Sequence, residues 1–133
     1  MRKTFDNPDS VPAPSGGYSH VVRLDLGTGA LLLVSGQIAS SEFGELVGGD
    51  SMAAQAERVF EQLGSILAAH DASFGDVINI RTYVTDMSRI DEYARVRRRH
   101  LTGEPPTSTT IEVSRLVVPG ALVEVDVTAA VAA

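Results

Sequence analysis

The sequence contains no cysteine and no tryptophan in its 133 residues, and aromatic residues make up only 5% of the chain. The absence of cysteine excludes disulfide bonds, thiolate nucleophiles and cysteine-based metal sites, and it is typical of a reducing compartment. No apolar stretch reaches the roughly 20 residues that span a bilayer, and no apolar run follows Met1 as in a secretory signal. We therefore expect a soluble cytoplasmic protein with no membrane partner and a core of aliphatic side chains.

Positive charge is also scarce, since 17 Asp and Glu residues outnumber 11 Lys and Arg residues and give a formal net charge of −6. An acidic chain is a poor match for a polyanion, so we expect no nucleic-acid partner. One local exception is the segment 95–100 (RVRRRH), which falls in the last turns of an expected helix. Cations at that end complement the helix dipole. An RNA-binding surface is the alternative interpretation, which the lack of interleaved aromatic residues disfavours.

The length, with 44% apolar and 21% charged residues, is typical of one globular domain, which we expect over residues 1–133. Apolar residues at three- and four-residue spacing predict two amphipathic helices, over 50–70 and 88–101. A Gly-Thr-Gly turn at 27–29 joins two apolar runs and predicts a β-hairpin. An entry loop rich in proline and glycine occupies the first twenty residues. The expected strands are residues 21–26, 30–38, 76–87, 109–116 and 121–131.

The helix termini carry recognisable capping signals. Asp50 or Ser51 can cap the first helix, and Ser88 with Asp91 has the spacing of a capping box in the second. On the first helix, the polar side is expected to carry Glu57, Arg58, Glu61 and Gln62. The element order therefore predicts an α+β fold, with two helices on one face of a mixed sheet.

The last expected strand alternates sharply between apolar and polar residues. Val123, Val125 and Val127 point to one face, whereas Glu124 and Asp126 point to the other. Two helices cover only one face of a sheet, and the surrounding strands are largely apolar. We therefore expect the second face to be covered by self-association, in a number of copies that the pattern does not fix.

Glu124 and Asp126 are the first candidates for chemistry, because neighbouring carboxylates raise each other's pKa and one can then act as a general acid or base. The alternative is a pair of solvated acids on a sheet face. The second candidate is the segment 35–38 (SGQI), where a glycine at the end of a buried strand allows a ligand to approach the backbone, or merely bends the strand. No metal or cofactor is expected, since metal-ligand spacing is absent among His20, His70 and His100.

The sequence resembles the RidA/YjgF family, also labelled L-PSP endoribonucleases, in an ordered set of segments that covers nearly the whole chain. These segments are GGYSH (16–20), VSGQI (34–38), GELVGGD (44–50), residues 53–87, EYARV (92–96) and residues 109–129. The resemblance implies a chorismate-mutase-like α+β sandwich, with a mixed six-stranded sheet and two helices on one face. It also implies a homotrimer with a β-barrel core and ligand clefts between subunits.

The best-known members of that family hydrolyse reactive enamines and imines, such as 2-aminoacrylate, to a carbonyl compound and ammonia without a metal or cofactor. By resemblance, Glu124 is the catalytic residue that holds the attacking water, and Asp126 is the second acid of the same motif. Tyr18 matches a tyrosine that the family precedes with proline, where this chain has Gly17. The residues expected to bind a small-molecule substrate are Tyr18, Ser35, Gly36, Ser108 and Thr110.

The chain departs from the family at Ser108. Active members carry an arginine there, in the pattern P-A-R-S-x-V-E-V, that clamps the substrate carboxylate in a bidentate pair. A hydroxyl does not replace a guanidinium, and losing one partner of such a pair costs about 2–5 kcal/mol, or roughly 30- to 4000-fold in rate. We therefore expect weak activity on 2-imino acids, unless Arg81 or Arg97 supplies a cation.

Three functional hypotheses follow from the sequence. The first is a hydrolase of imines or enamines that lack the carboxylate contact, with Ser108 and Thr110 forming hydrogen bonds to a neutral substrate. The second is a non-catalytic trimer that binds a small ligand in its intersubunit clefts. The third, an RNA-cleaving enzyme, is disfavoured by the acidic net charge.

Overall fold

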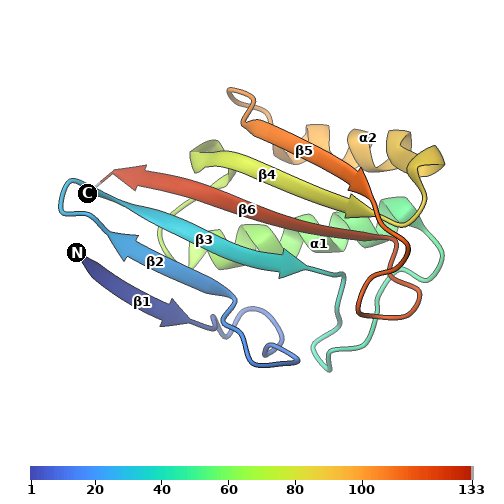
Figure 1. Ribbon diagram of the computed structural model, residues 1–133, viewed down its shortest axis with the longest axis horizontal. Helices are drawn as coiled ribbons and strands as arrows, with labels where there is room; N and C mark the ends of the chain where they lie inside the picture. The colour runs from blue at the N-terminus through green and yellow to red at the C-terminus, as the bar shows by residue number, and fades with distance from the viewer. Residues whose placement is uncertain (133) are drawn as a thin grey trace.

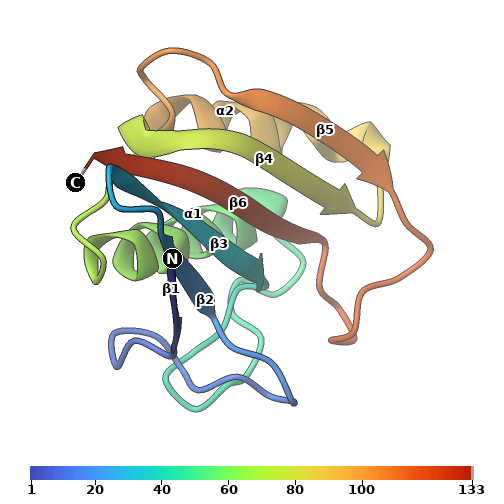
Figure 2. The same cartoon turned by 60° about the vertical axis from the view of Figure 1, so that its left-hand side comes forward.

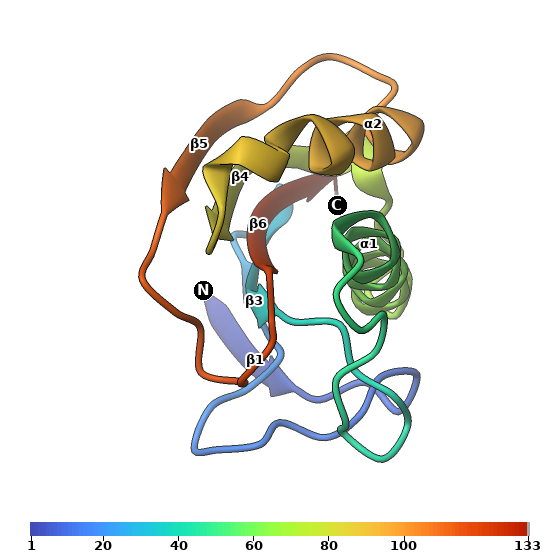
Figure 3. The same cartoon turned by 90° about the vertical axis from the view of Figure 1, so that its right-hand side faces the viewer.

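The computed structural model describes residues 1–132 and contains one mixed six-stranded sheet with two α-helices on one of its faces (Figures 1 and 3). The strand order is β1-β2-β3-β6-β4-β5, and all neighbours are antiparallel except the parallel pair of β4 and β5. The strands are β1 (Arg2–Asp6), β2 (Val21–Asp25), β3 (Gly29–Gln37), β4 (Val77–Val84), β5 (Thr107–Glu112) and β6 (Val123–Ala132). This architecture confirms the fold class expected from the sequence.

The hairpin predicted around residues 27–29 is confirmed as β2 and β3, which pair from Val21 opposite Val34 to Asp25 opposite Ala30. Strand β1 was not predicted. It lies at the start of the segment expected to be an entry loop, contains one large apolar residue, Phe5, and is held by its backbone pairing with β2. Strand β5 ends at Glu112, earlier than the expected 109–116.

Helix α1 (Met52–Ala68) begins as predicted after Ser51, whose side chain accepts a hydrogen bond from the Ala54 amide at 3.1 Å. The expectation that Gln62 lies on the solvent side is wrong: it is only 3% exposed, because its amide group bonds to the end of β3. The capping box expected at Ser88 is not formed. Instead, a 3-10 turn, η2 (Met87–Arg89), precedes helix α2 (Ile90–His100). A second turn, η1 (Phe74–Asp76), leads into β4.

The two faces of the sheet differ as the alternation in β6 predicts. Val123, Val125 and Val127 are buried against the helices and the rest of the aliphatic core. Glu124 and Asp126 lie on the opposite face, here called the open face, which carries no helix (Figure 3). Among residues 1–132, no helix is both long and apolar enough to cross a membrane.

The open face has an apolar part and a polar part. Phe5 lies opposite Val22, which lies opposite Leu33, so these three side chains form a row across β1, β2 and β3. Phe5 is 66% exposed and Leu33 is 48% exposed. The polar part lies across β6 and β4, where Asp126 pairs with Arg81 and Glu124 with Tyr83. An apolar row of this kind is unfavourable in water unless another surface covers it.

Candidate functional site

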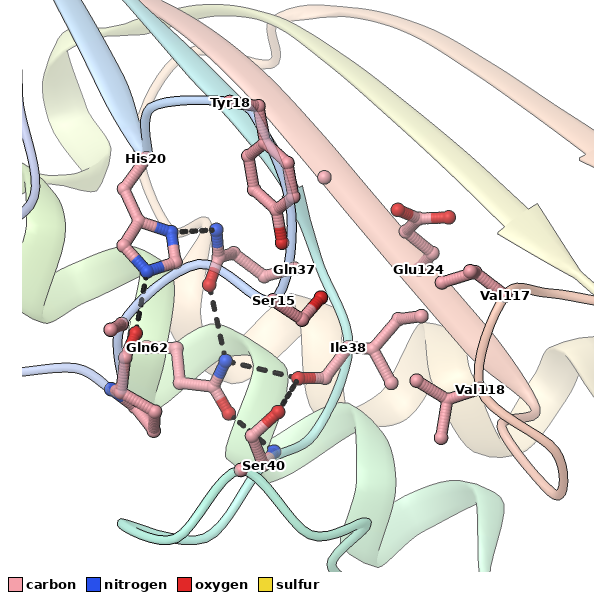
Figure 4. A pocket seen from close by; sticks show the side chains of 14 residues that line it. Ser15, Tyr18, His20, Gln37, Ile38, Ser40, Gln62, Val117, Val118 and Glu124 are labelled. Atoms are coloured by element: carbon pink, nitrogen blue, oxygen red, sulfur yellow. Dashed lines mark hydrogen bonds between the residues drawn. The ribbon is translucent and has the colours of Figure 1, made fainter.

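A small pocket of about 100 Å³ opens at the end of β3 (Figure 4). Three loops line it: residues 7–20 between β1 and β2, residues 38–51 between β3 and α1, and residues 113–122 between β5 and β6. Glu124 enters the pocket from β6 (Figure 4). Ligand sites for drug-sized molecules are typically ~300–1,000 Å³, so the space within one chain suits a small metabolite or part of one.

The pocket floor is built by an irregularity in β3. Val34 pairs with Val127 and Gln37 pairs with Val125, so the register shifts across Ser35 and Gly36. The carboxylate of Glu124 fills the space that a Cβ at Gly36 would need. Only glycine therefore allows this acid to lie directly on the backbone of β3. Bulges of this kind are common beside functional sites, where they redirect side chains.

The environment of Glu124 favours its protonated form. Burial in the pocket raises the pKa of this carboxyl group above its ordinary value, and the negative charge of Asp126 raises it further. Asp126 is held in place by two donors: the Arg81 Nε at 2.9 Å and the Tyr83 hydroxyl at 3.2 Å. The raised pKa brings Glu124 closer to neutral pH, where a carboxyl group can both accept and release a proton.

Tyr18 lines the pocket from the loop before β2 and is 46% exposed (Figure 4). Its ring stands edge-on to the ring of His20, with centroids 6.3 Å apart. Val117 and Val118 line the pocket from the loop between β5 and β6. Sequence analysis did not identify these two valines, because nothing in the local pattern of a loop indicates which strand end it covers.

A buried polar network supports the pocket from below (Figure 4). The Gln37 amide nitrogen donates to the Ser35 carbonyl at 3.1 Å and to His20 Nδ1 at 3.2 Å. Gln62 from α1 donates to Gln37 Oε1 at 3.1 Å and accepts from the Ser40 amide at 2.8 Å. These bonds tie the pocket loops to α1. The sequence offered one signal for them, a glutamine directly after Gly36.

His20 is a structural member of this network. It is 5% exposed, and its Nε2 lies 2.6 Å from the Pro12 carbonyl oxygen. With Nε2–H donating to Pro12 and Nδ1 accepting from Gln37, a neutral ring satisfies both contacts. Among residues 1–132, no group of three His, Asp or Glu side chains is placed to hold a metal ion.

The predicted site residues fall into two groups. The chain brings Tyr18, Gly36 and Glu124 together in the pocket. Ser35 lies beside it, but its amide donates to the His20 carbonyl and its hydroxyl to the Ser19 carbonyl, so both groups are used within the chain.

Ser108 and Thr110 lie elsewhere, on the outer strand β5. They pair with Ile80 and Thr82, whose side chains face the helices, whereas Glu124 faces the other way. Within one chain they are therefore on the opposite side of the sheet from the pocket.

The two arginines considered as replacements for the missing cation also lie on different parts of the fold. Arg81 is on the open face and is paired with Asp126. Arg97 is on α2 and donates from Nη1 to the Ser108 hydroxyl at 2.9 Å. Of the two, only Arg97 places its guanidinium group at Ser108.

Comparison with known proteins agrees with this architecture. Residues 9–131 match the model of the Endoribonuclease L-PSP family. The chain is 38% identical over 127 residues to the protein DfrA of Myxococcus xanthus, covering 95% of this chain and 94% of that protein. It is 32% identical over 117 residues to a RutC family protein of Pyrococcus abyssi, covering 87% and 88% of the two chains. The crystal structure of RidA from a Psychrobacter species superposes with a TM-score of 0.83 at 29% identity, covering 96% and 98%.

The fold thus defines a small α+β protein with a mixed six-stranded sheet and two helices on one face. The chain belongs to the RidA/YjgF family, which carries the L-PSP endoribonuclease label.

Proposed function

We propose that the protein is a Rid-like hydrolase that converts a small imine or enamine to a carbonyl compound and ammonia. The observation that carries this proposal is the position of Glu124, which lies in the pocket against Gly36. Burial, followed by the charge of Asp126, raises the pKa of this group. A carboxyl group poised in this way suits a reaction that needs one proton removed and one proton delivered.

In the proposed reaction, an enamine first takes a proton on carbon and gives up one from nitrogen, and so becomes the imine. Water then attacks the imine carbon as the carbon–nitrogen π electrons move to nitrogen, and Glu124 takes the proton that water loses. Glu124 returns this proton to the nitrogen, giving a carbinolamine. Glu124 then takes the hydroxyl proton and delivers it to the nitrogen, and cleavage of the carbon–nitrogen bond releases the carbonyl compound and ammonia. Proton transfer is sufficient for every step, so the proposal needs no metal or cofactor.

The other pocket groups position the reactants. Gly36 leaves room for the Glu124 carboxylate against the backbone of β3, and Tyr18 supplies a hydroxyl and an aromatic edge at the pocket rim. Ile38, Val117 and Val118 supply apolar side chains to the wall of the pocket. Correct placement of water and substrate by such groups accelerates a reaction that is already favourable.

We also propose that the complete site forms between subunits of a homotrimer. Glu124 faces the open face, whereas Ser108 and Thr110 lie on the other side of the sheet. A ligand that contacts both sets therefore requires two copies of the chain. The exposed row of Phe5, Val22 and Leu33 supports the same assembly, because it provides an apolar surface for a second copy.

The test is hydrolysis of freshly generated imines by the purified protein, one series with a carboxylate and one without. We expect acceleration by the wild-type protein and loss of at least about 100-fold in kcat for Glu124→Gln, consistent with loss of a general acid–base group. Glu104→Gln is the matched control, since Glu104 is exposed in a loop and does not line the pocket. No acceleration of any imine, with stabilisation of the fold by a small ligand, would favour the non-catalytic binding protein. RNA cleavage that persists through purification and depends on the arginines of residues 95–99 would favour the ribonuclease.

A further inference from the structure

A second cavity, of about 580 Å³ and here called the loop cavity, lies under the loop between β5 and β6. Ligand sites are typically ~300–1,000 Å³, whereas the pocket around Glu124 holds only about 100 Å³. The loop supplies most of the wall, and one residue comes from the end of β4. The lining consists of Thr85 and residues 114–122.

The loop cavity lies on the open face, next to the pocket that holds Glu124. Leu122 comes two residues before Glu124 in an extended segment of alternating burial, so both side chains point to the same side of the sheet. The Thr85 amide donates to the Leu122 carbonyl at 3.1 Å, which continues the pairing of β4 and β6 into the floor of the cavity. Val117 and Val118 line both spaces and therefore form a shared wall (Figure 4).

The wall of the loop cavity is largely aliphatic, and no Asp or Glu side chain of residues 1–132 lines it. Arg115 is the charged residue of the lining, and it is exposed, so its charge is solvated. Val117 is 83% exposed, and apolar surface of this kind is unfavourable in water. An apolar group bound in the cavity would cover it. The aliphatic residues of the wall are Leu116, Val117, Val118, Pro119, Ala121 and Leu122.

Both ends of the loop are anchored to the rest of the fold. At the first end, the Val113 amide donates to a carbonyl of β4 at 2.8 Å. At the second end, the buried Gln55 of α1 donates to the Gly120 carbonyl at 3.1 Å and accepts from the Leu122 amide at 2.8 Å. Residues 114–117 take part in none of the hydrogen bonds formed within the described chain. The floor of the cavity is therefore preformed, while its rim is free to adjust to the shape of a ligand.

We propose that the loop cavity binds the apolar substituent of the substrate, so that the protein prefers imines and enamines with a branched aliphatic or aromatic substituent. This inference rests on the proposed hydrolase function and names its substrate class. With the reacting carbon at Glu124, the substituent extends past Val117 and Val118 toward Leu122. A cavity of ~150 Å³ holds one benzene ring. The pocket around Glu124 is smaller than that, whereas the loop cavity has ample room.

A second copy of the chain is the alternative occupant of the loop cavity. The apolar row proposed for self-association, Phe5, Val22 and Leu33, lies on β1, β2 and β3. The loop cavity lies at the ends of β4 and β6, beyond that row in the order of the sheet. A copy that packs on the row therefore does not by itself fill the cavity.

The kinetic test compares two imines that differ only in their substituent, methyl or benzyl, with each rate divided by that of the uncatalysed reaction. We expect wild-type kcat/KM to be at least about 10-fold higher for the benzyl compound, the lower end of what one methylene contributes in an apolar pocket. Leu116→Asn should reduce this preference by placing an amide in the wall, and Ser114→Phe should reduce it by filling the cavity from an exposed position. Leu26→Asn is the matched control, since Leu26 is 50% exposed in the turn between β2 and β3. Equal wild-type kcat/KM for the two imines, or a preference that both variants retain, would overturn the inference and leave the hydrolase intact.

A binding experiment separates this inference from the proposed function. Phenylacetamide is the probe, acetamide is its small analogue, and the methyl signals of Leu116 and Leu122 are followed by NMR of the full chain. We expect saturable shifts with phenylacetamide and none with acetamide, while the Leu26 signals stay in place. These shifts in a protein that hydrolyses no imine would support the apolar site and count against the hydrolase. Absence of a phenylacetamide response at Leu116 and Leu122 would overturn the inference, and contacts of Leu116 with a second copy in a mixed-label sample would then show that subunit packing fills the cavity.

Discussion

The carboxylate of Glu124 lies in the space that a side chain at Gly36 would occupy, so a residue of β6 rests on the backbone of β3. The contact lies at the register shift of β3, which falls across Ser35 and Gly36. The position of the proposed proton carrier therefore depends on a glycine in another strand. This dependence leads to the first prediction.

Gly36→Ala should displace the Glu124 carboxyl group and lower kcat by about 100-fold, since a shift of ~1 Å in a reacting group has an effect of that size. The fold should persist, because the displaced group is the far end of a flexible side chain. Gly103→Ala is the control, as nothing lies within 4 Å of a Cβ built there. The rate of imine hydrolysis measures the change in kcat, and circular dichroism shows whether the fold persists. Unchanged kcat in Gly36→Ala would show that the position of Glu124 is not important for the reaction.

Asp126→Asn should shift the pH dependence of the reaction. Burial is the main cause of the raised pKa of Glu124, and the charge of Asp126 is the second. Removing that charge should lower the pKa of Glu124, and the limb of the pH–rate profile that reports Glu124 should move to lower pH. Asp91→Asn, an exposed acid in the first turn of α2, should leave the profile unchanged. A profile that stays in place for both variants would contradict coupling between Glu124 and Asp126.

Glu124 should also make the fold less stable as the pH rises. Its pKa is raised in the folded state, so the folded protein binds more protons than the unfolded chain between the two pKa values. The free energy of unfolding therefore decreases as the pH rises through that interval. Glu124→Gln should remove this decrease and be more stable than wild type above it, by on the order of 0.5 kcal/mol because the group is partly solvated. Urea unfolding at matched pH values measures the free energy of unfolding of both proteins. A wild-type protein that is more stable than Glu124→Gln at high pH would contradict this prediction.

Gln62→Met should destabilise the protein by about 1–3 kcal/mol, because it leaves the Ser40 amide and the Gln37 side-chain oxygen without their buried partner. Methionine has a similar length, so loss of volume is not the cause. Glu61→Met, on the exposed side of the same turn, should change the free energy of unfolding by no more than about 0.5 kcal/mol. Chemical denaturation at one protein concentration compares the variants. Equal stability of Gln62→Met and wild type would show that the network is dispensable.

Leu33→Arg should weaken self-association through the open face. It places a charge in the apolar row of Phe5, Val22 and Leu33, where a second copy is proposed to pack. Sedimentation equilibrium should show the mass of a trimer for the wild-type chain and a shift toward the mass of one chain for the variant. Phe43→Arg is the control, since Phe43 is 82% exposed on a loop. A wild-type protein that sediments as a single chain would exclude the trimer.

Periodicity was sufficient to predict both helices, the hairpin of β2 and β3, and the two faces of β6. It did not reveal β1, because Arg2–Asp6 has little apolar content and forms a strand only through pairing with β2. It also placed Gln62 in solvent, since helical spacing cannot show that a polar side chain has buried partners. Such features depend on contacts between elements that are distant in sequence.

The candidate site, like the fold, could be predicted from the sequence only in part. The motif around Gly36 and the strand around Glu124 were both identified, and they meet in the pocket. The alignment placed Ser108 where the family has arginine, but it could not show that Arg97 of the preceding helix reaches that hydroxyl. A change of residue type is visible in one sequence, whereas a cation supplied from a different helix becomes visible only in three dimensions.

The last strand in chain order, β6, lies between β3 and β4 (Figures 1 and 2). During synthesis, the hairpin of β2 and β3 and the unit of β4, α2 and β5 leave the ribosome earlier, each with an unpaired strand edge. The two units join only when β6 emerges and pairs with both. Because exposed edges promote aggregation, we expect an incomplete chain of this protein to be prone to aggregation until its final strand is available.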